Sequence, residues 1–320
     1  MRILVTGGAG YIGAISVERL LEAGHQVTVL DSLVTGHRDA VPDGASLAEG
    51  SLGDRAVLDR VLGETAFDAA LHCAARSLVG QSIDDPALYY RENVVGGITL
   101  LDALRAHGID RIVFSSTASV YGAPDKVPIR ENAPVRPVNP YGASKLAFEG
   151  AMGWYAAYGL RSVALRYFNV AGASDRRGER HDVETHLIPN ILAAAAGGPQ
   201  VTLFGDDYPT ADGTAIRDYI HVLDLADAHL AALELTERMD PGIEVCNLGS
   251  GAGFSVRQVL EATRAVVGRP IPHRYGPRRV GDPPVLVAAN RRAAELLGWH
   301  PQRGSLERMI GSAWRLVDHP

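Results

Sequence analysis

The sequence begins with a short apolar run that leads directly into a loop rich in glycine. Residues 2–6 have the pattern of a buried strand, and the loop that follows opens a stretch with helical patterning. Gly7, Gly10 and Gly13 stand at every third position, so the backbone can turn tightly and approach a ligand closely. Amide groups at the start of the helix then face an anion such as a diphosphate. A strand, a glycine loop and a helix in this order predict a dinucleotide-binding unit.

The second apolar run ends at an acidic residue, Asp31. It follows Gly13 by about 20 residues, the spacing at which such a unit places a carboxylate on the adenosine ribose. A carboxylate accepts hydrogen bonds from ribose hydroxyls and repels a 2′-phosphate. Ser32 and Leu33, the next residues, carry no positive charge. The sequence therefore predicts NAD rather than NADP as the cofactor.

Strand and helix patterns alternate through the first half of the chain. The predicted strands are 2–6, 26–30, 67–71, 111–115 and 162–166. Continuous apolar strands separated by helices are typical of a parallel sheet covered on both faces. We therefore expect an α/β fold, a Rossmann-type doubly wound parallel sheet.

Beyond about residue 170 the chain becomes richer in Gly, Pro, Asp and Arg, and the loops lengthen. This change predicts a smaller α/β C-terminal domain that covers the first. We expect a cofactor-binding domain at residues 1–172 and a substrate-binding domain at 173–320. The chain is expected to return to the first domain around 216–247.

Composition excludes several classes of protein. The 320 residues are 46% hydrophobic and 21% charged, which is too apolar for a disordered chain. The net charge of −6 argues against non-specific nucleic-acid binding, which needs a basic face. No run approaches the ~18 apolar residues of a membrane span, so no membrane association is expected. Two cysteines, Cys73 and Cys246, do not make a disulfide framework and predict a cytoplasmic location.

Tyr141 and Lys145 stand four positions apart near the start of a predicted helix, so they share one helix face. A free phenol has a pKa of about 10, and a nearby ammonium together with a nicotinamide cation favours the phenolate. Such a pair is common on protein surfaces. This pair, however, follows the hydroxyl cluster Ser115, Ser116 and Thr117, which lies at the end of a predicted strand. In α/β sheets, ligands bind at such strand ends. The pattern favours a catalytic tyrosine.

Several motifs together resemble the extended short-chain dehydrogenase/reductase family. They are TGGAGYIG at 6–13, FSSTASVYG at 114–122, the Tyr141–Lys145 pair and RYFN at 166–169. A longer segment at 204–222, FGDDYPTADGTAIRDYIHV, is similar to the UDP-glucose 4-epimerases (UDP-galactose 4-epimerases) of that family. The resemblance extends over the whole chain.

The resemblance implies an isomerase that interconverts UDP-galactose and UDP-glucose with tightly bound NAD. The expected reaction is transient oxidation at C4, rotation of the 4-keto intermediate and re-reduction. Tyr141 is then the base on the sugar 4-hydroxyl, Lys145 tunes it and holds the nicotinamide ribose, and Thr117, where the family usually has Ser, relays the proton. The resemblance also implies a UDP-hexose substrate, a UDP-sugar-binding domain at 173–320, and a homodimer that packs through helices including the Tyr141 helix.

Two sets of binding residues follow from the resemblance. For NAD they are Gly7, Gly10, Tyr11, Ile12, Gly13, Asp31, Ser32, Ser51, Leu52, Cys73, Ala74, Ala75, Ser77, Asn93, Ser115, Tyr141, Lys145 and Tyr167. For the substrate they are Thr117, Tyr141, Asn169, His186, Leu187, Arg217, Tyr219, Arg279 and Asp282. In the second set Arg217 and Arg279 would hold the diphosphate, and Asp282 the uridine ribose.

Besides Thr117, four positions depart from the family pattern. Ser51 stands where Asp commonly contacts the adenine, and Ser77 stands where Lys often approaches the cofactor phosphates, with Arg76 adjacent. His186 replaces an Asn at the nucleotide. Leu286 occupies the position where Tyr excludes, and a small residue admits, an N-acetyl group at C2. We expect at most weak turnover of N-acetylated sugars, and an epimerase acting on UDP-GlcNAc or a UDP-pentose stays open as an alternative.

Two other functions fit part of the sequence. A nucleotide-sugar 4,6-dehydratase of the same family needs an acidic pair directly after Thr117, to eliminate water, and Ala118 and Ser119 stand there instead. A non-catalytic NAD sensor would explain the glycine loop and Asp31 but would leave the tyrosine and lysine pair without a purpose.

The segment from His181 to His186 invites a metal interpretation. The two histidines are five positions apart, which does not place them on one face of a helix, and no further ligand pair with zinc spacing is recognisable. We therefore expect no metal.

Overall fold

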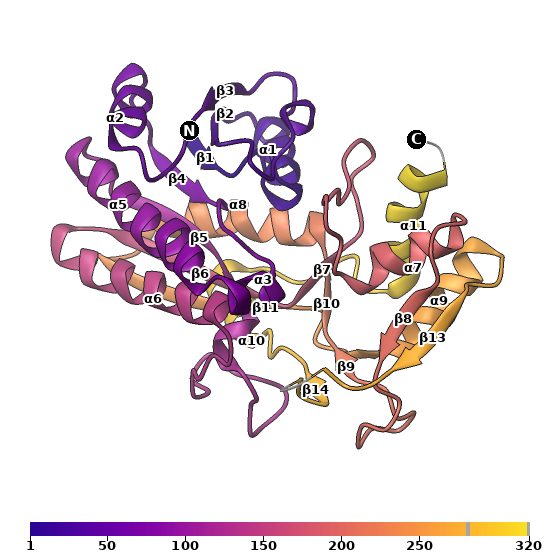
Figure 1. The fold of residues 1–320 in the computed structure, drawn as a ribbon. Helices are drawn as coiled ribbons and strands as arrows, with labels where there is room; N and C mark the ends of the chain where they lie inside the picture. The colour runs from indigo at the N-terminus through magenta and orange to yellow at the C-terminus, as the bar shows by residue number, and fades with distance from the viewer. Residues whose placement is uncertain (280–281, 319–320) are drawn as a thin grey trace.

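The computed structural model describes residues 1–279 and 282–318 of the chain. Within these residues the main sheet has seven strands, all parallel, in the order β3-β2-β1-β4-β5-β6-β11 (Figure 1). The strands are β1 (Arg2–Thr6), β2 (Gln26–Asp31), β3 (Ser46–Glu49), β4 (Ala69–His72), β5 (Arg111–Thr117), β6 (Arg161–Tyr167) and β11 (Gly242–Leu248). The order reverses between β1 and β4, the switch point where such sheets bind ligands. The predicted Rossmann-type α/β fold is confirmed.

Helices cover both faces of this sheet, so its strands are buried on both sides. One face packs on α1 (Tyr11–Glu22), α8 (Val222–Arg238) and α10 (Arg291–Leu297). The other face packs on α2 (Arg55–Glu64), α5 (Gly96–Ala106) and α6 (Pro140–Tyr155), and Figure 1 shows α5 and α6 running side by side along it. Between β4 and α5 the chain forms α3 (Val79–Asp84), α4 (Pro86–Tyr89) and the π-helical turn η2 (Tyr90–Val95).

A second lobe has its own hydrophobic core. It consists of α7 (Leu187–Ala195), β8 (Val201–Phe204), α9 (Val256–Val267), β13 (His273–Gly276) and α11 (Leu306–Asp318). Strands β8 and β13 form a parallel pair. Short strands lie between this lobe and the main sheet: β7 (Asn169–Ala171) pairs with β10 (Tyr219–His221), while β9 (Ile216–Arg217) lies between β12 (Phe254–Ser255) and β14 (Val285–Leu286). The exact domain boundaries stay a prediction.

The structure adds to the sequence prediction at a few places. Strand β3 was not predicted, because Ser46–Glu49 is a short edge strand without a continuous apolar run. Strand β5 continues past the predicted end to Thr117, which places the whole hydroxyl cluster inside the strand. The core strand predicted at 67–71 is shifted to Ala69–His72, since Asp68 accepts a hydrogen bond from the Arg2 amide at the strand entrance.

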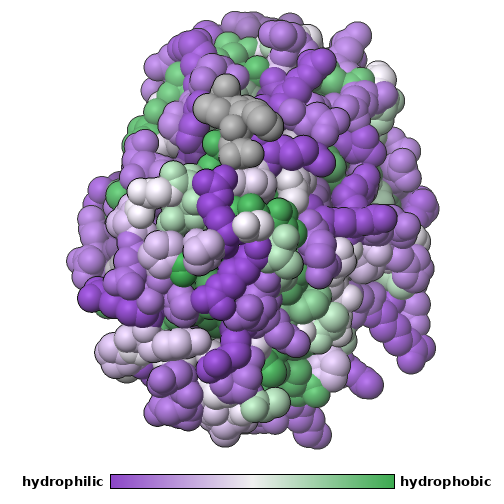
Figure 2. Space-filling view, turned by 90° about the vertical axis from the view of Figure 1, so that its right-hand side faces the viewer, coloured by the Kyte–Doolittle hydropathy of each residue, from purple (hydrophilic) through white to green (hydrophobic). Residues whose placement is uncertain are grey.

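Two surface properties bear on partners. Within residues 1–279 and 282–318, no helix combines the length and the apolar content needed to cross a membrane. The face shown in Figure 2 is largely hydrophilic, with apolar side chains in small groups between hydrophilic ones. Large apolar docking patches are usually several hundred Å² and continuous, and this view shows small separate groups.

Candidate active site

The glycine loop is packed so closely that no side chain fits at two of its positions. Gly7 has φ +73°, and a Cβ there would lie 2.4 Å from the backbone nitrogen of Ala74. A Cβ on Gly13 would lie 2.1 Å from the carbonyl oxygen of Gly7. Helix α1 begins after Gly10, which provides no side-chain cap, so its first amides remain available to an anion. This geometry fits a dinucleotide diphosphate.

Asp31 supports the same loop from the end of β2. Its side chain is buried, and Oδ2 accepts a hydrogen bond from the Ala9 amide at 2.9 Å while Oδ1 accepts one from the Leu33 amide at 2.9 Å. Each carboxylate oxygen has a second lone pair for a ribose hydroxyl. Asp31 therefore shapes the loop and retains the acceptors that a 2′,3′-diol needs.

Asn93, which was predicted to contact NAD, binds two neighbouring segments of the protein through its side chain. Its Oδ1 accepts a hydrogen bond from the Arg76 amide at 2.8 Å, and its Nδ2 donates to the Arg76 carbonyl and to Ser144 Oγ, each at 3.0 Å. Asn93 thus ties the loop after β4 to helix α6. Asn93 therefore positions the Cys73–Ser77 segment, which contains predicted cofactor residues.

The other predicted cofactor residues lie on the carboxyl edge of the sheet or in the first turn of α1. Ser32 follows β2, Ser51 and Leu52 follow β3, the Cys73–Ser77 segment follows β4, and Tyr11 and Ile12 open α1. Tyr11 donates a hydrogen bond of 2.5 Å to the carbonyl of Gly172, which joins α1 to the segment after β7. The fold therefore brings residues from these four segments to one edge, as strand order requires.

Tyr141, Thr117 and Lys145 converge at the carboxyl end of β5. Tyr141 stands in the first turn of α6, where Asn139 Oδ1 caps the helix by accepting from the Gly142 amide at 2.8 Å. Burial raises the pKa of Tyr141 to about 12, and its hydrogen bond with Thr117 acts in the opposite direction. Lys145 lies one turn further along.

The buried ammonium of Lys145 is anchored to β5. Its Nζ donates to the Ser115 carbonyl at 2.8 Å and lies 4.6 Å from the centre of the Phe114 ring. Burial lowers the pKa of Lys145 to about 8. At neutral pH the lysine is still mostly protonated, so a positive charge is held against the end of β5, one helical turn along α6 from Tyr141.

A buried polar chain supports Ser115. Its Oγ lies 2.9 Å from Nε2 of His229 and 3.3 Å from Sγ of Cys73. Burial lowers the pKa of His229 to about 4, so this imidazole is neutral. Tyr167 also bonds to Ser115, and burial raises its pKa well above 10. His229 was not predicted from the sequence, because nothing in the sequence of α8 distinguishes it from other core positions.

A second buried support lies behind Thr117. Glu149 Oε2 and Arg166 Nη2 are 2.6 Å apart, and both side chains are less than a tenth exposed. Ser116 Oγ donates to Glu149 Oε1 at 2.5 Å, and Arg166 Nη1 donates to the Tyr121 hydroxyl at 2.9 Å. This ion pair was not predicted from the sequence. The available signal was that Glu149 follows Lys145 by four positions and so shares its helix face.

Among the predicted diphosphate and ribose ligands, Arg217 and Asp282 contact each other. Arg217 Nη2 lies 2.6 Å from Asp282 Oδ1, and the Tyr208 hydroxyl donates to Oδ2 at 3.2 Å. Arg279, by contrast, stacks on Phe204, with 4.5 Å between the guanidinium carbon and the ring centre. The structure therefore brings two of these three residues together.

Asn169 and Tyr219 lie on the paired strands β7 and β10. Asn169 Nδ2 donates to the Asp218 carbonyl at 3.0 Å. Tyr219 is buried in the core of the second lobe beside Phe254, and burial raises its pKa to about 12. Leu286 lies on β14 opposite Arg217 and packs on the small apolar cluster around Phe168.

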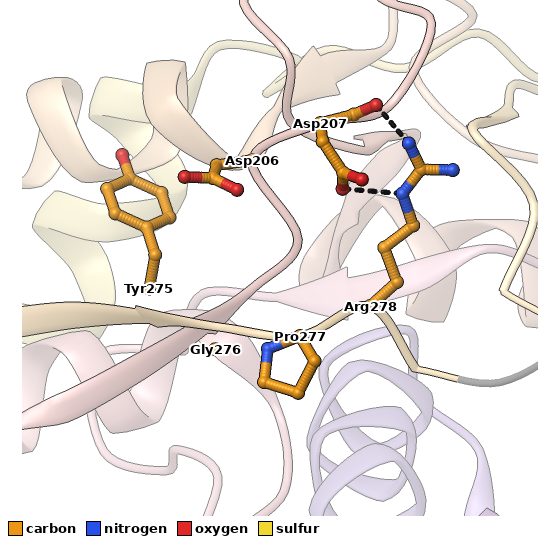
Figure 3. Close-up of a pocket in the computed structure, with 6 residues that line it drawn as sticks. All are labelled: Asp206, Asp207, Tyr275, Gly276, Pro277 and Arg278. Carbon is orange, nitrogen blue, oxygen red and sulfur yellow. Dashed lines mark hydrogen bonds and ion pairs between the residues drawn. The ribbon is translucent and has the colours of Figure 1, made fainter.

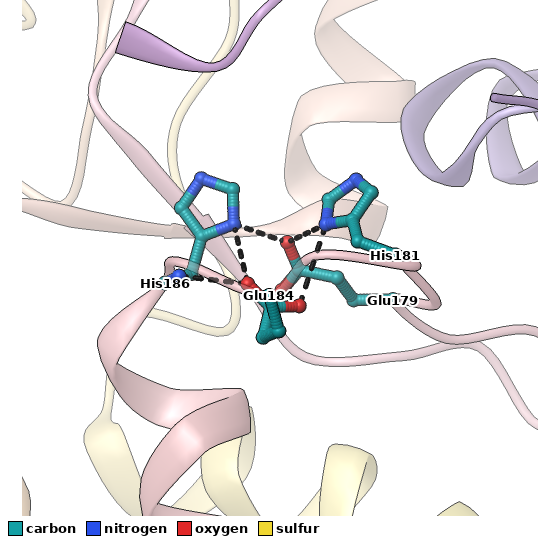
Figure 4. A group of neighbouring side chains, drawn as sticks. All are labelled: Glu179, His181, Glu184 and His186. Carbon is teal, nitrogen blue, oxygen red and sulfur yellow. Dashed lines mark hydrogen bonds and ion pairs between the residues drawn. The ribbon is translucent and has the colours of Figure 1, made fainter. Parts of the chain in front are cut away.

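His186 and Leu187 lie where α7 begins. Leu187 is its first residue, and His186 is the N-cap residue with its ring turned back to the preceding loop. There Nδ1 of His186 is 2.6 Å from Glu179 Oε1 and 3.1 Å from Glu184 Oε1 (Figure 4). These carboxylates raise the pKa of His186 to about 10 against the effect of burial. Neither Glu179 nor Glu184 was recognised as part of a site from the sequence.

An open pocket lies where β8 and β13 end. Asp206, Asp207, Tyr275, Gly276, Pro277 and Arg278 line it (Figure 3). Arg278 Nε lies 2.6 Å from Asp207 Oδ1, and its guanidinium stacks on Tyr208. The Arg278 guanidinium therefore binds Asp207 and Tyr208. The resemblance assigned the next residue, Arg279, and not Arg278, to a diphosphate.

The sequence matches known proteins over its whole length. The model of the NAD dependent epimerase/dehydratase family matches residues 3–249. A UDP-glucose 4-epimerase of Corynebacterium glutamicum is 52% identical over 98% of this chain and 95% of that protein.

Solved structures agree in fold. A UDP-glucose 4-epimerase from Brucella ovis in complex with NAD has a TM-score of 0.95 and 44% identity, covering 98% of each chain. One from Bifidobacterium longum in complex with NAD+ and UDP has a TM-score of 0.93 and 35% identity, covering 99% of each. On this similarity in sequence and in structure, the chain belongs to the NAD dependent epimerase/dehydratase family.

Proposed function

We propose that the chain is a UDP-glucose 4-epimerase that interconverts UDP-galactose and UDP-glucose with bound NAD. The observation that carries the proposal is the contact of the Tyr141 hydroxyl with Thr117 at the same sheet edge as the glycine loop. Relatives about half identical over nearly the full chain carry this name. With a cofactor loop and a catalytic tyrosine on one edge of the sheet, hydride transfer to the cofactor and proton transfer to the tyrosine can take place at the same sugar carbon.

The residues at the carboxyl edge fit NAD. The glycine loop and the first amides of α1 would receive the diphosphate, and Asp31 the adenosine ribose. Ser115, Lys145 and Tyr167 lie at the nicotinamide end in this assignment. When bound, NAD supplies a hydride acceptor and donor for C4 of the sugar.

Tyr141 carries the proton chemistry. With a pKa of about 12 its hydroxyl is protonated at neutral pH, so it needs positive charge nearby to act as a base. Lys145, held by the Ser115 carbonyl, provides one such charge. Tyr141 then accepts the proton of the sugar 4-hydroxyl through its contact with Thr117 and returns it when the carbonyl is reduced.

The nucleotide end is assigned to Arg217 and Asp282. The guanidinium suits the diphosphate, and the carboxylate suits the uridine ribose hydroxyls. Firm contacts to the nucleotide and few polar contacts to the hexose would allow the 4-keto sugar to rotate between the two hydride transfers. Leu286, on β14 opposite Arg217, is assigned to limit the space at C2.

We further infer a cytoplasmic homodimer. The helical layer of η2, α5 and α6, together with the 3-10 turn η4 (Ala156–Tyr158) that follows α6, exposes large apolar side chains: Trp154 is 82% exposed, Tyr158 57% and Val95 57%. A symmetric dimer that buries this layer would remove them from water. Light scattering after gel filtration tests the dimer, and Trp154→Asp is expected to shift the mass towards that of one chain.

Proton NMR of the purified protein with UDP-galactose and no added cofactor tests the activity. UDP-glucose is expected to appear without stoichiometric NADH, because the cofactor is regenerated in each cycle. A stable 4-keto-6-deoxy sugar would indicate a 4,6-dehydratase instead. No turnover of any UDP-sugar, even with NAD added, would support the NAD sensor.

A further inference from the structure

The loop between β7 and α7 brings four potential metal ligands together. Glu179, His181, Glu184 and His186 each direct one ligand atom to a common centre, and these atoms lie within 4.8 Å of one another (Figure 4). Both histidines present Nδ1 to the two carboxylates. This segment is not helical, so the two histidines can approach each other although they are five positions apart in the sequence.

The histidine-to-carboxylate distances in the cluster, with Glu184 offering Oε2 to His181 and Oε1 to His186, are close to the ligand separations of a tetrahedral site. Nδ1 of His181 lies 3.3 Å from Glu179 Oε1 and 3.3 Å from Glu184 Oε2, and Nδ1 of His186 lies 3.1 Å from Glu184 Oε1. Zinc binds nitrogen and oxygen at about 2.0–2.1 Å, so ligands at the corners of a tetrahedron are about 3.3 Å apart. The shorter separation of 2.6 Å between His186 and Glu179 would need to open by well under 1 Å.

The charge of the cluster also calls for a cation. The Glu179 side chain is only 8% exposed, and among the described residues the side chains that its carboxylate contacts are the two histidines. Glu184 is 20% exposed and has the same two side-chain partners. Two neighbouring carboxylates need about two positive charges, which either two imidazolium protons or one divalent cation can supply. Imidazole and carboxylate together are donors that zinc accepts.

We propose that Glu179, His181, Glu184 and His186 form a structural site for one divalent cation of the zinc class. All four ligands come from one eight-residue loop, and no ligand position is left for a reacting water. A closed four-ligand site of this kind stabilises a fold rather than catalysing a reaction.

The location of the cluster indicates what the cation would stabilise. Arg180, inside the same loop, pairs with Asp39 at 2.5 Å, and its carbonyl lies 3.2 Å from Nε2 of His37. Both partners follow β2 on the cofactor side of the molecule. The loop ends at His186, directly before α7. A bound cation would therefore fix the loop that joins the glycine-loop region to the start of α7.

Direct metal binding tests this proposal. Untagged protein is treated with a chelator, desalted and titrated with Zn²⁺ in competition with a chromophoric chelator, and separately with Co²⁺. We expect one Zn²⁺ per chain and a Co²⁺ absorption band with the intensity of a tetrahedral complex. Zn²⁺ should also raise the thermal unfolding midpoint of the apo protein, because it binds the folded state.

Two ligand variants and one matched control identify the site. His181→Gln and Glu184→Gln are each expected to weaken Zn²⁺ binding at least tenfold and to abolish the Co²⁺ band. His107→Gln is the control, since His107 also contacts a carboxylate, at 3.1 Å from Asp59, and within residues 1–279 and 282–318 that is its only carboxylate partner. Circular dichroism establishes that each variant is folded, and two independent ligand variants guard against the loss of one of them to misfolding.

Three results would overturn the proposal: absence of stoichiometric Zn²⁺ binding, an octahedral Co²⁺ spectrum, or equal weakening by His107→Gln. None of these readouts depends on turnover of a UDP-sugar. The metal site and the epimerase activity can therefore fail separately.

Discussion

Glu149 and Arg166 form an ion pair of 2.6 Å directly behind the strand end that carries Thr117, with side chains only 5% and 7% exposed. Helix α6 supplies the carboxylate, and the same helix supplies Lys145 about one turn earlier and Tyr141 about two turns earlier. The pair therefore fixes the catalytic helix to the sheet. Burial of both charges is tolerated because Ser116 and Tyr121 satisfy the remaining hydrogen-bonding positions.

Breaking this pair is expected to destabilise the protein strongly. Glu149→Ala leaves the Arg166 guanidinium buried without its counter-charge, which costs about 3–5 kcal/mol. Urea unfolding followed by circular dichroism measures this free energy. The double variant Glu149→Met, Arg166→Met is expected to lose less than Glu149→Ala alone, since no charge remains buried. Glu64→Ala is a matched control, because Glu64 and Arg60 form an exposed pair at 3.8 Å, worth about 0–1 kcal/mol. A similar loss in both alanine variants would contradict the account.

Tyr141→Phe is expected to lose at least about 100-fold in turnover, the usual contribution of a general acid–base group. The ring stays in place, so binding of NAD and UDP should change by less than about threefold. Initial rates of UDP-glucose formation give the first quantity, and fluorescence titration gives the second. Tyr158→Phe, on the exposed end of the same helical layer, serves as the control and should keep full activity. Full activity in Tyr141→Phe would refute the assignment of the base.

Arg217 and Asp282 are expected to act on substrate binding rather than on the chemical step. Arg217→Ala removes a charge-assisted contact with the diphosphate and should raise KM for UDP-galactose about tenfold or more, with NAD affinity unchanged. Steady-state kinetics and an NAD titration separate the two effects. Arg274→Ala is a suitable control, since Arg274 lies exposed on β13 and bonds only to Thr202 Oγ1 in the described structure. If Arg217→Ala lowered kcat and left KM unchanged, the assignment to the diphosphate would be wrong.

Buried neutral histidines predict sensitivity to acid. Burial lowers the pKa of His229 to about 4 and that of His72 to about 3. The unfolded chain binds these protons near pH 6.5 and the folded chain does not, so stability is complete above about pH 6.5 and falls as the pH drops towards the folded pKa. Each such histidine contributes about 1.4 kcal/mol per pH unit within that window.

Unfolding free energies between about pH 6 and pH 4.5 measure this effect. His229→Gln is expected to flatten the pH dependence by roughly 1.4 kcal/mol per pH unit, although it loses some stability at neutral pH. His300→Gln, at an exposed position, should leave the slope unchanged. An unaltered slope in His229→Gln would mean that this imidazole is not held neutral in the folded protein.

The fold and the cofactor side of the candidate site follow from local sequence patterns. Apolar strands with helices between them determine a parallel sheet, and parallel strands place their carboxyl ends at one edge. Asp31 could therefore be predicted as a cofactor residue, and Tyr141 with Lys145 as a catalytic pair, from the sequence alone. The close approach of Gly7 to Ala74 adds the physical reason why glycine is needed there.

Contacts between distant segments could not be predicted in the same way. Asn93 binds the backbone of Arg76 and the side chain of Ser144, and no spacing in the sequence shows this. The pairing of Arg217 with Asp282 depends on the packing of β9 against β14. The Glu179 cluster was missed for a different reason: helical spacing was applied to a segment that forms a loop.

The central claim is that the hydrogen on C4 leaves the sugar and returns to the same carbon from the other side without exchange with water. UDP-galactose that carries deuterium at C4 tests it most directly. The account predicts that UDP-glucose formed in ordinary water retains the deuterium at C4, because the hydride stays on the bound cofactor while only the hydroxyl proton passes through Tyr141. Replacement of the deuterium by solvent hydrogen would contradict the account, since C4 would then have been deprotonated rather than oxidised.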